Sequence, residues 1–224
     1  MDWPVFRPVA DHAVLVECGT AISDPVHDAV LHLDQALTAH PFPGFTESVP
    51  AFVNLLVCFD PVITDHAAVE AHLRHLLSAP PQAKTIPTLR EVLVCYDAPF
   101  APDLLAVARQ TGLSPDAVIN AHLAARYDVF MYGFAPGYAY LAGVPQELQL
   151  PRKPSPVRDM PAGSVMIAGP QCLVTTLVMP TGWWVIGRSP TRILTGDAAR
   201  PFLFDVGDRV TFRRISRAAF EAAS

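Results

Sequence analysis

The feature that most constrains the fold is a long stretch, from Gly133 to Pro190, in which glycine and proline recur every few residues. Short apolar and aromatic runs separate them, and runs of this length suit strands better than helices. Proline fixes φ and removes a backbone donor, whereas glycine admits positive φ, so the stretch favours tight, held turns. Together with the strand-like segment Arg209–Phe212, this pattern predicts short strands that form a compact β-barrel or sandwich.

The beginning of the chain has a different pattern, in which strands alternate with helices. Ala13–Cys18 and Phe52–Phe59 are apolar runs typical of strands. Ser23 and Asp65 are expected to cap two helices. Their apolar faces would be Val26, Val30, Leu33 and Leu37 in the first helix and Val69, Leu73, Leu76 and Leu77 in the second. We therefore expect a small α+β domain over residues 1–88, with both helices on one face of the strands and a linker at 79–84.

Residues 89–224 are expected to form a second, mostly-β domain. It would begin with a strand at Arg90–Tyr96, continue with two short helices at about 102–110 and 115–125, and end with a helix near Ala218. The predicted fold class is thus an α+β N-terminal domain followed by a mostly-β barrel domain.

The charge pattern argues against nucleic acid as a partner. The formal net charge is −5, only 17% of residues are charged, and no run of Lys or Arg exists. Leu105–Ala124 has the turn glycine of a helix-turn-helix motif, but its second helix carries neither Lys nor Arg. A helix that follows phosphates needs such charges, so a packed helical hairpin is the better interpretation.

Other features argue against a membrane or secreted protein. No window approaches the roughly 18 uncharged apolar residues of a membrane span, and Met1–Pro4 does not resemble a secretory signal. The four cysteines stand far apart, at Cys18, Cys58, Cys95 and Cys172. Three of them sit in apolar, strand-like runs and are expected to be buried reduced thiols, with a nucleophilic Cys172 as the alternative, and a cytoplasmic location follows as the default.

Four cations in the loop-rich stretch are candidates for anion binding: Arg152, Lys153, Arg158 and Arg188. They stand among apolar and turn residues rather than on a charged helix face. A guanidinium in such a setting can bind a carboxylate or phosphate in fork geometry. A structural ion pair is the competing interpretation for each of them.

Several other residues are candidates for a ligand site. We expect the barrel loops to line a groove walled by Tyr138, Tyr140, Gln171 and Trp183, with Arg152 and Arg188 at its polar end. Ser164 follows Ala162-Gly163 and could contact a substrate, act as a nucleophile or serve as a turn hydroxyl.

The histidines give two further hypotheses. His122 lies at a predicted helix end just before the glycine-rich stretch and is a candidate for a functional role, with packing as its alternative. His66, His72 and His75 share one predicted helix, but no third ligand stands at suitable spacing. No metal site is predicted.

The loop-rich stretch resembles the family called allophanate hydrolase subunit 1, which includes the B-subunit of the bacterial ATP-dependent 5-oxoprolinase and a kinase-inhibitor protein. The family pattern Gly-Phe-x-Pro-Gly-Phe-x-Tyr-Leu-x-Gly is matched by Gly133–Gly143, with Tyr138 in place of Phe. Further matches cover the rest of the chain: Pro151-Arg152-Lys153, Pro161–Gly169, Gly182–Pro190 and Pro201–Val210. His122 also falls where the family has a histidine before its Tyr-x-Val run.

The resemblance implies a cyclophilin-like barrel as the second domain and a homologous subunit 2 as partner. With a third, LamB/YcsF-type subunit, the complex would open a lactam such as 5-oxoproline at the expense of ATP. Arg152, Lys153 and Arg188 would then stabilise a phosphate or the substrate carboxylate, and His122 would be a candidate proton shuttle. Two alternatives remain open: a carboxyltransferase subunit of urea-carboxylase type, acting on a urea- or amide-like acceptor with biotin carried by a partner, or a non-catalytic inhibitor of a sensor kinase.

Three departures from the family pattern bear on the substrate. After Ile167-Ala168-Gly169, only Gln171 of the usual run survives, and Thr175 replaces a tyrosine. The usual Pro-Arg pair becomes Pro156-Val157, with Arg158 one place later, and Pro-Gly-Gly-Trp becomes Pro180–Trp183 with Thr181 as its second residue. If these positions contact the substrate, its chemistry can differ from that of 5-oxoproline.

Overall fold

The structure of the protein is a computed structural model that describes residues 3–78 and 87–223. The chain divides into two compact units, residues 1–86 and 87–224. The linker predicted at 79–84 lies outside the described residues. None of the helices in the described ranges is long and apolar enough to cross a membrane.

The first unit is built on an antiparallel sheet with the strand order β1-β2-β4-β3. Its strands are β1 (Val5–Val9), β2 (Ala13–Glu17), β3 (Phe45–Pro50) and β4 (Asn54–Phe59). The sequence predicted the two central strands, β2 and β4, and missed the two edge strands. Both edge strands carry proline and charged residues and are largely exposed, as edge strands commonly are.

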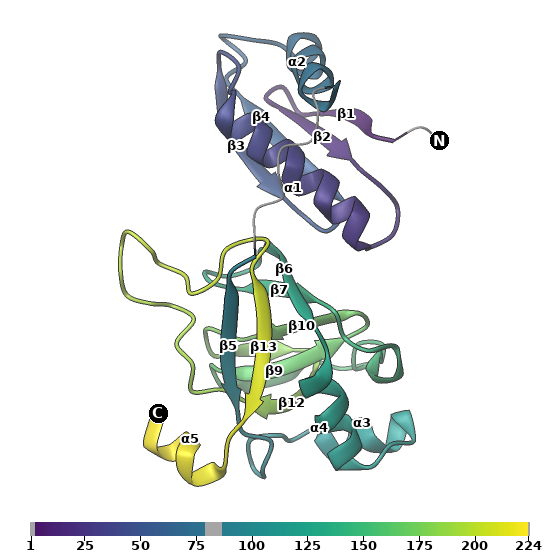
Figure 1. Cartoon of the computed structure of the whole chain (residues 1–224), viewed down its shortest axis with the longest axis vertical. Helices are drawn as coiled ribbons and strands as arrows, with labels where there is room; N and C mark the ends of the chain where they lie inside the picture. Colours follow the sequence, from purple (N-terminus) through teal and green to yellow (C-terminus); the bar gives the residue numbers. More distant parts are fainter. Residues whose placement is uncertain (1–2, 79–86, 224) are drawn as a thin grey trace. The chain divides into compact units, whose positions relative to one another are not determined.

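Two helices, α1 (Asp24–Ala39) and α2 (His66–Ser78), cover one face of this sheet (Figure 1). The predicted cap of α2 is present, because the Ala68 N–H donates to the Asp65 carboxylate at 2.8 Å. Along β4 every second residue is buried beneath the helices, namely Leu55, Val57 and Phe59. This alternation of period 2 is what places one face of the strand in the core.

The second unit is a nearly closed barrel with the strand order β12-β9-β10-β7-β6-β13-β5. Two backbone hydrogen bonds join its ends, from the Cys95 N–H to the Arg188 carbonyl (2.8 Å) and from the Arg188 N–H to the Cys95 carbonyl (2.9 Å). The strands are β5 (Leu89–Val94), β6 (Tyr127–Tyr132), β7 (Ala139–Ala142), β9 (Ser164–Ala168), β10 (Gln171–Val174), β12 (Trp184–Arg188) and β13 (Arg209–Arg214). The fold class predicted from the sequence is therefore confirmed.

Strand β9 is buried on both of its faces. Val165 and Ile167 point into the main core, whereas Met166 and Ala168 belong to a second apolar cluster with Tyr138 and Trp183. Since successive side chains of a strand point to opposite faces, the second cluster lies on the outer face of the barrel. A small antiparallel ribbon accompanies it, made of β8 (Val157–Met160) and β11 (Met179–Thr181).

Helices α3 (Leu104–Thr111) and α4 (Pro115–Ala124) pack on the barrel (Figure 1). Val107 and Val118, one from each helix, are fully buried in the main core, so the pair forms the packed hairpin that the sequence favoured. A 3-10 turn, η1 (Gln146–Leu148), and a terminal helix, α5 (Arg217–Ala223), complete the unit.

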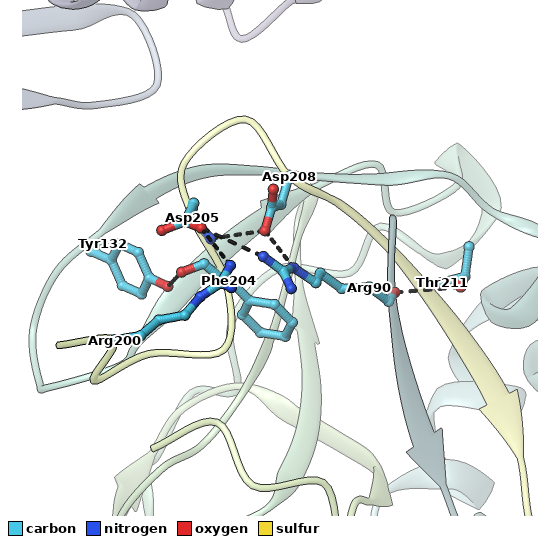
Figure 2. A network of polar contacts seen from close by, with 7 residues as sticks. All are labelled: Arg90, Tyr132, Arg200, Phe204, Asp205, Asp208 and Thr211. Carbon is cyan, nitrogen blue, oxygen red and sulfur yellow. Dashed lines mark hydrogen bonds and ion pairs between the residues drawn. The ribbon is translucent and has the colours of Figure 1, made fainter. Parts of the chain in front are cut away.

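A polar network fixes the loop before β13 to the beginning of β5 (Figure 2). The Arg90 guanidinium donates to the Asp208 carboxylate at 2.7 Å, and the Asp205 N–H donates to the same oxygen at 3.0 Å. Arg200 reaches Asp205 at 3.2 Å, and the Tyr132 hydroxyl donates to the Phe204 carbonyl at 2.6 Å. The segment Pro201–Val210, which matches the family pattern, thus has a structural role in this chain.

Candidate functional site

A pocket with a volume of about 160 Å³ lies over the second apolar cluster, on the outer face of the barrel. Its floor is Met166 of β9 and Leu173 of β10. Its rim is Arg152 and the turn that leads from β11 to β12, and its aromatic walls are Phe134, Tyr138, Tyr140 and Trp183. The strands therefore supply an apolar floor, while the glycine- and proline-rich loops supply the walls.

The four aromatic rings form a continuous chain around the pocket. Phe134 and Tyr138 have ring centroids 5.5 Å apart, Tyr138 and Tyr140 are 6.3 Å apart, and Tyr140 and Trp183 are 6.0 Å apart. The Tyr138 hydroxyl contacts the Met179 sulfur at 2.6 Å. Burial raises the pKa of Tyr138 to about 12, so this phenol is neutral at physiological pH. Rings in such arrangements suit a flat or partly apolar ligand.

The loop that carries Phe134 and Tyr138 is held in one shape by its backbone. Gly137 has a φ of +71°, and a Cβ at that position would press on Leu194 at 2.7 Å. The Thr176 hydroxyl donates to the Pro136 carbonyl at 2.7 Å and ties the loop to the segment before β11. Phe134 itself has a φ of +72° and is 77% exposed. An apolar ring presented to solvent in this conformation needs support from its surroundings, which this tie provides.

Arg152 is the cation of the pocket. It is exposed, and its guanidinium lies 5.7 Å from the centre of the Trp183 ring. Among the residues that the structure describes, 3–78 and 87–223, none forms a hydrogen bond or an ion pair with the Arg152 guanidinium. Its charge lowers the pKa of the neighbouring Tyr140, against the larger effect of burial, which raises it. Its five donors are therefore available to an anionic group of a ligand.

Lys153, the next residue, does not line the pocket. Its ammonium group points away and pairs with the Asp103 carboxylate at 2.7 Å. The side chains are only 10% and 19% exposed, respectively. The competing interpretation from the sequence, a structural ion pair, thus describes the geometry of Lys153.

Arg188 lies at the barrel seam rather than at the pocket, contrary to the groove expected from the sequence. Its Nε donates to the Ala162 carbonyl at 3.2 Å, and its guanidinium lies 6.0 Å from the Phe100 ring and 5.7 Å from the Phe220 ring. Phe220 belongs to α5, so the structure places Arg188 between the barrel closure and the terminal helix.

Three further candidates also lie away from the pocket. Gln171, expected in its wall, pairs with Ala142 and Ala168 at the other end of β10 and does not line it. Arg158 is exposed on β8. Ser164 is buried, and its hydroxyl donates to the Pro161 carbonyl at 2.7 Å, which is the geometry of a turn hydroxyl.

His122 is separated from the pocket by strand β10. Its ring lies in the main core, 2.8 Å from the Tyr96 hydroxyl and 3.6 Å from the Cys172 sulfur. Cys172 points inward, while its neighbour Leu173 points outward and forms the pocket floor. Burial lowers the pKa of His122 to about 3, so the ring is neutral and shielded from water. The structure thus does not bring His122 together with Arg152.

Some residues of the site were not singled out from the sequence. Asp103 stands at the beginning of α3, where its carboxylate is turned to Lys153 rather than to the helix N-terminus. Thr181 lines the pocket, and its hydroxyl accepts from the Trp183 N–H at 3.0 Å. Thr181 is one of the departures from the family pattern, and that departure was the available signal. In the described part of the chain, no group of three His, Cys, Asp or Glu side chains could hold a metal ion.

Comparison with known proteins gives concordant results. The family described as carboxyltransferase domain, subdomain C and D, matches residues 4–204. The B-subunit of the Bacillus subtilis 5-oxoprolinase is 35% identical over 230 residues, which cover 96% of this chain and 94% of the relative.

Two solved structures share the fold. A crystal structure of TTHA0988 superposes with a TM-score of 0.80 at 34% identity, covering 92% of this chain and 40% of the longer one. The urea carboxylase of Kluyveromyces lactis has a TM-score of 0.76 at 16% identity, and this chain matches 22% of it. The chain thus spans less than half of either protein. From the matched residues and the near full-length relative, the chain belongs to the carboxyltransferase domain, subdomain C and D, family.

Proposed function

We propose that this chain is the subunit of an ATP-dependent complex that opens 5-oxoproline or a related lactam, and that it contributes the pocket at Arg152. The observation that carries the proposal is an exposed guanidinium with free donors beside a wall of four aromatic rings. Homology to the B-subunit of 5-oxoprolinase over 96% of the chain supports the choice of reaction. The guanidinium would bind the carboxylate of the lactam or a phosphate oxygen.

The pocket is proposed to be one part of a site shared between subunits. Its volume of about 160 Å³ is below the roughly 300 Å³ at which pockets begin to enclose small ligands. The residues that line it include no carboxylate, imidazole or thiol. Burial raises the pKa of both tyrosines in its wall, Tyr138 and Tyr140, so these phenols are protonated at neutral pH and are unsuited to act as a general base. A second chain would have to close the pocket and supply the proton transfer.

The partner would be the homologous subunit 2, with a LamB/YcsF-type subunit as third member. Exposed apolar side chains support such a contact. Phe134 lines the pocket and is 77% exposed, and Leu177 and Val178, which are 43% and 64% exposed, follow Thr176, whose hydroxyl donates to the Pro136 carbonyl in the same loop as Phe134. Exposed apolar side chains that gather at one place are typical of surfaces that bind another protein.

In the proposed reaction, ATP transfers its γ-phosphoryl group to the lactam oxygen, which makes the ring carbon a better electrophile. A first water attacks this carbon and the ring C–N bond breaks, so that the nitrogen leaves with a proton and the phosphoryl group stays on the newly formed carboxyl group. A second water then releases phosphate and leaves the free carboxylate of the opened amino acid. Arg152 would hold the anionic group through these steps and offset charge that develops nearby. Trp183 and Tyr138 are buried beside it, and closure of the pocket by a second chain would remove water from the guanidinium, which makes such interactions stronger.

A second candidate function has one observation in its favour. The matched family is named for the carboxyltransferase domain, so carboxyl transfer to a urea- or amide-like acceptor, with biotin on a partner, uses the same pocket. In that case Arg152 would bind the carboxylated group instead of a lactam carboxylate.

The test is to co-express the chain with its subunit 2 and its LamB/YcsF-type subunit and to measure ATP hydrolysis with a panel of lactams and amides. We expect lactam-dependent turnover in the complex and none in the isolated chain. Arg152→Ala should lower kcat/KM by at least tenfold, and Arg158→Ala, which alters an exposed arginine outside the pocket, should be neutral. Turnover that needs a biotinylated carrier would favour the second candidate, and robust turnover by the isolated chain would contradict the shared site.

A further inference from the structure

We propose that Asp103 and Lys153 form a positioning pair that fixes the Arg152 guanidinium at the mouth of the pocket. This inference rests on the proposed function, since it concerns the cation of the same pocket. It assigns to Lys153 a role different from the ligand contact expected from the sequence.

The first observation concerns Asp103. An aspartate at the start of a helix usually accepts from the N–H groups of the first turn, but no such bond is present at α3. Its Oδ2 instead accepts from the Val185 N–H and from the Lys153 ammonium group, both at 2.7 Å. The Asp103 N–H donates in return to the Val185 carbonyl at 3.0 Å. Asp103 is thereby held to Val185 of β12 through both its carboxylate and its backbone N–H.

The second observation is that both neighbours of Arg152 are tied to the same strand region. The Trp184 indole N–H donates to the Pro151 carbonyl at 2.7 Å. The Lys153 N–H donates to the Gly182 carbonyl at 2.7 Å. Arg152 is thus carried on a short segment whose two ends are held against residues 182–184, and from there its guanidinium lies over the Trp183 ring.

The third observation is the burial of the pair. The Lys153 and Asp103 side chains are 10% and 19% exposed, and the ammonium group lies 5.8 Å from the Trp184 ring centre. A charge in such surroundings stays ordered only while its partner is present. Removing either charge leaves the hydrogen bonds of the Pro151 carbonyl and the Lys153 N–H in place, but it frees the Lys153 side chain and loosens that end of the segment, so Arg152 should sample other positions.

The first part of the test follows Arg152 itself in the full chain. The Nε–H resonance of Arg152 is assigned by its loss in Arg152→Lys, and the nearby Trp183 ring shifts it from the position of a free arginine. We expect Lys153→Met and Asp103→Asn to move this resonance toward the free position, and Lys153→Arg to restore it. Asp103→Asn keeps an acceptor for the Val185 N–H, so it serves if Lys153→Met fails to fold. An unchanged resonance in a folded variant of either kind would overturn the proposal.

The second part uses the assembled complex with 5-oxoproline and ATP. Lys153→Met should raise KM about tenfold, the effect of losing one charge-assisted hydrogen bond, with kcat within about twofold. In an Arg152→Ala background, Lys153→Met should raise KM by less than about a further twofold, because the residue that Lys153 positions is already gone. A merely structural role predicts the same factor in both backgrounds, and that result would contradict the proposal.

The two parts also separate this inference from the proposed function. If Lys153→Met moves the resonance but Arg152→Ala leaves turnover unchanged, the pair does position Arg152 and the pocket does not bind the substrate. That outcome would retain the pair and overturn the assignment of the site.

Discussion

Arg152 and Arg188 stand in similar sequence surroundings but in different parts of the barrel. Each follows a short apolar or turn segment and precedes a residue next to proline. The guanidinium of Arg188 is engaged by a carbonyl oxygen and by two aromatic rings at the barrel seam. The guanidinium of Arg152 has an aromatic ring beneath it and a pocket before it. The comparison teaches that a guanidinium becomes a candidate for binding through unused donors beside a pocket, rather than through its membership of a motif.

The seam should be sensitive to changes in backbone shape, and this gives the largest expected effect. Gly163 has a φ of +80°, and a Cβ there would overlap the carbonyl oxygen of Ser189, the residue after Arg188. We expect Gly163→Ala to lower the free energy of unfolding by at least about 3 kcal/mol, because both the backbone conformation and the contact become strained. Urea denaturation of the full chain measures this.

The matched control is Gly169→Ala, on the turn between β9 and β10. Gly169 also has a positive φ, +52°, but a Cβ there would meet no atom within 4 Å. Its expected cost is about 1 kcal/mol, from the left-handed conformation alone. Equal costs at the two glycines would show that the seam has no special constraint.

The contribution to stability of the core beside β10, where His122 lies, should depend on pH. The residues on the pocket side of β10 should make no such pH-dependent contribution. Burial lowers the pKa of His122 from 6.5 to about 3. Between these values the unfolded chain binds a proton that the folded chain does not, so stability falls as the pH falls through this window. From pH 6.5 to pH 4 the loss from this group is up to about 3 kcal/mol.

Urea denaturation at several pH values checks this expectation, with His122→Gln as the comparison. Glutamine is neutral and can still form a hydrogen bond with Tyr96, which lies 2.8 Å from the histidine ring. The difference in stability between the wild-type chain and this variant should shrink or reverse as the pH falls. A difference that stays constant from pH 7 to pH 4 would show that His122 does not titrate in this way.

The smallest expected effect is that of Arg188 on stability. Arg188→Met removes a hydrogen bond to the Ala162 carbonyl and two ring contacts, so it should lower the free energy of unfolding by about 1–2 kcal/mol. Arg158→Met, at an exposed position of β8, should change stability by less than about 0.5 kcal/mol. If Arg188→Met left the free energy of unfolding unchanged, Arg188 would not stabilise the seam as we expect.

The elements of the fold were predictable where burial and periodicity coincide. The central strands β2 and β4 and all the helices of the first unit carry strong apolar patterns. The edge strands β1 and β3 do not, because their exposed faces hold residues such as Arg7 and Glu47. Their place in the sheet depends on pairing with a neighbour, which no local pattern indicates.

The candidate site was predictable only in part, for a geometric reason. Tyr138, Tyr140, Trp183 and Arg152 were expected together and do line one pocket. Gln171 and Arg188 come from the same motifs, yet they lie at another end of a strand and at the seam. Motif membership does not say which face or end of a strand a residue occupies. The Asp103–Lys153 pair spans 50 residues, and no local signal links its members.

The most direct test of the account compares Arg152→Ala with Arg188→Met in the assembled complex, with 5-oxoproline and ATP, as kcat/KM per folded molecule. The account predicts that Arg152→Ala lowers kcat/KM by roughly 10- to 100-fold, which corresponds to about 1.4–2.7 kcal/mol, with little change in melting temperature. It predicts that Arg188→Met lowers the melting temperature and leaves kcat/KM within about twofold. The reverse result, a loss of turnover at Arg188 and normal turnover at Arg152, would contradict the assignment of the pocket.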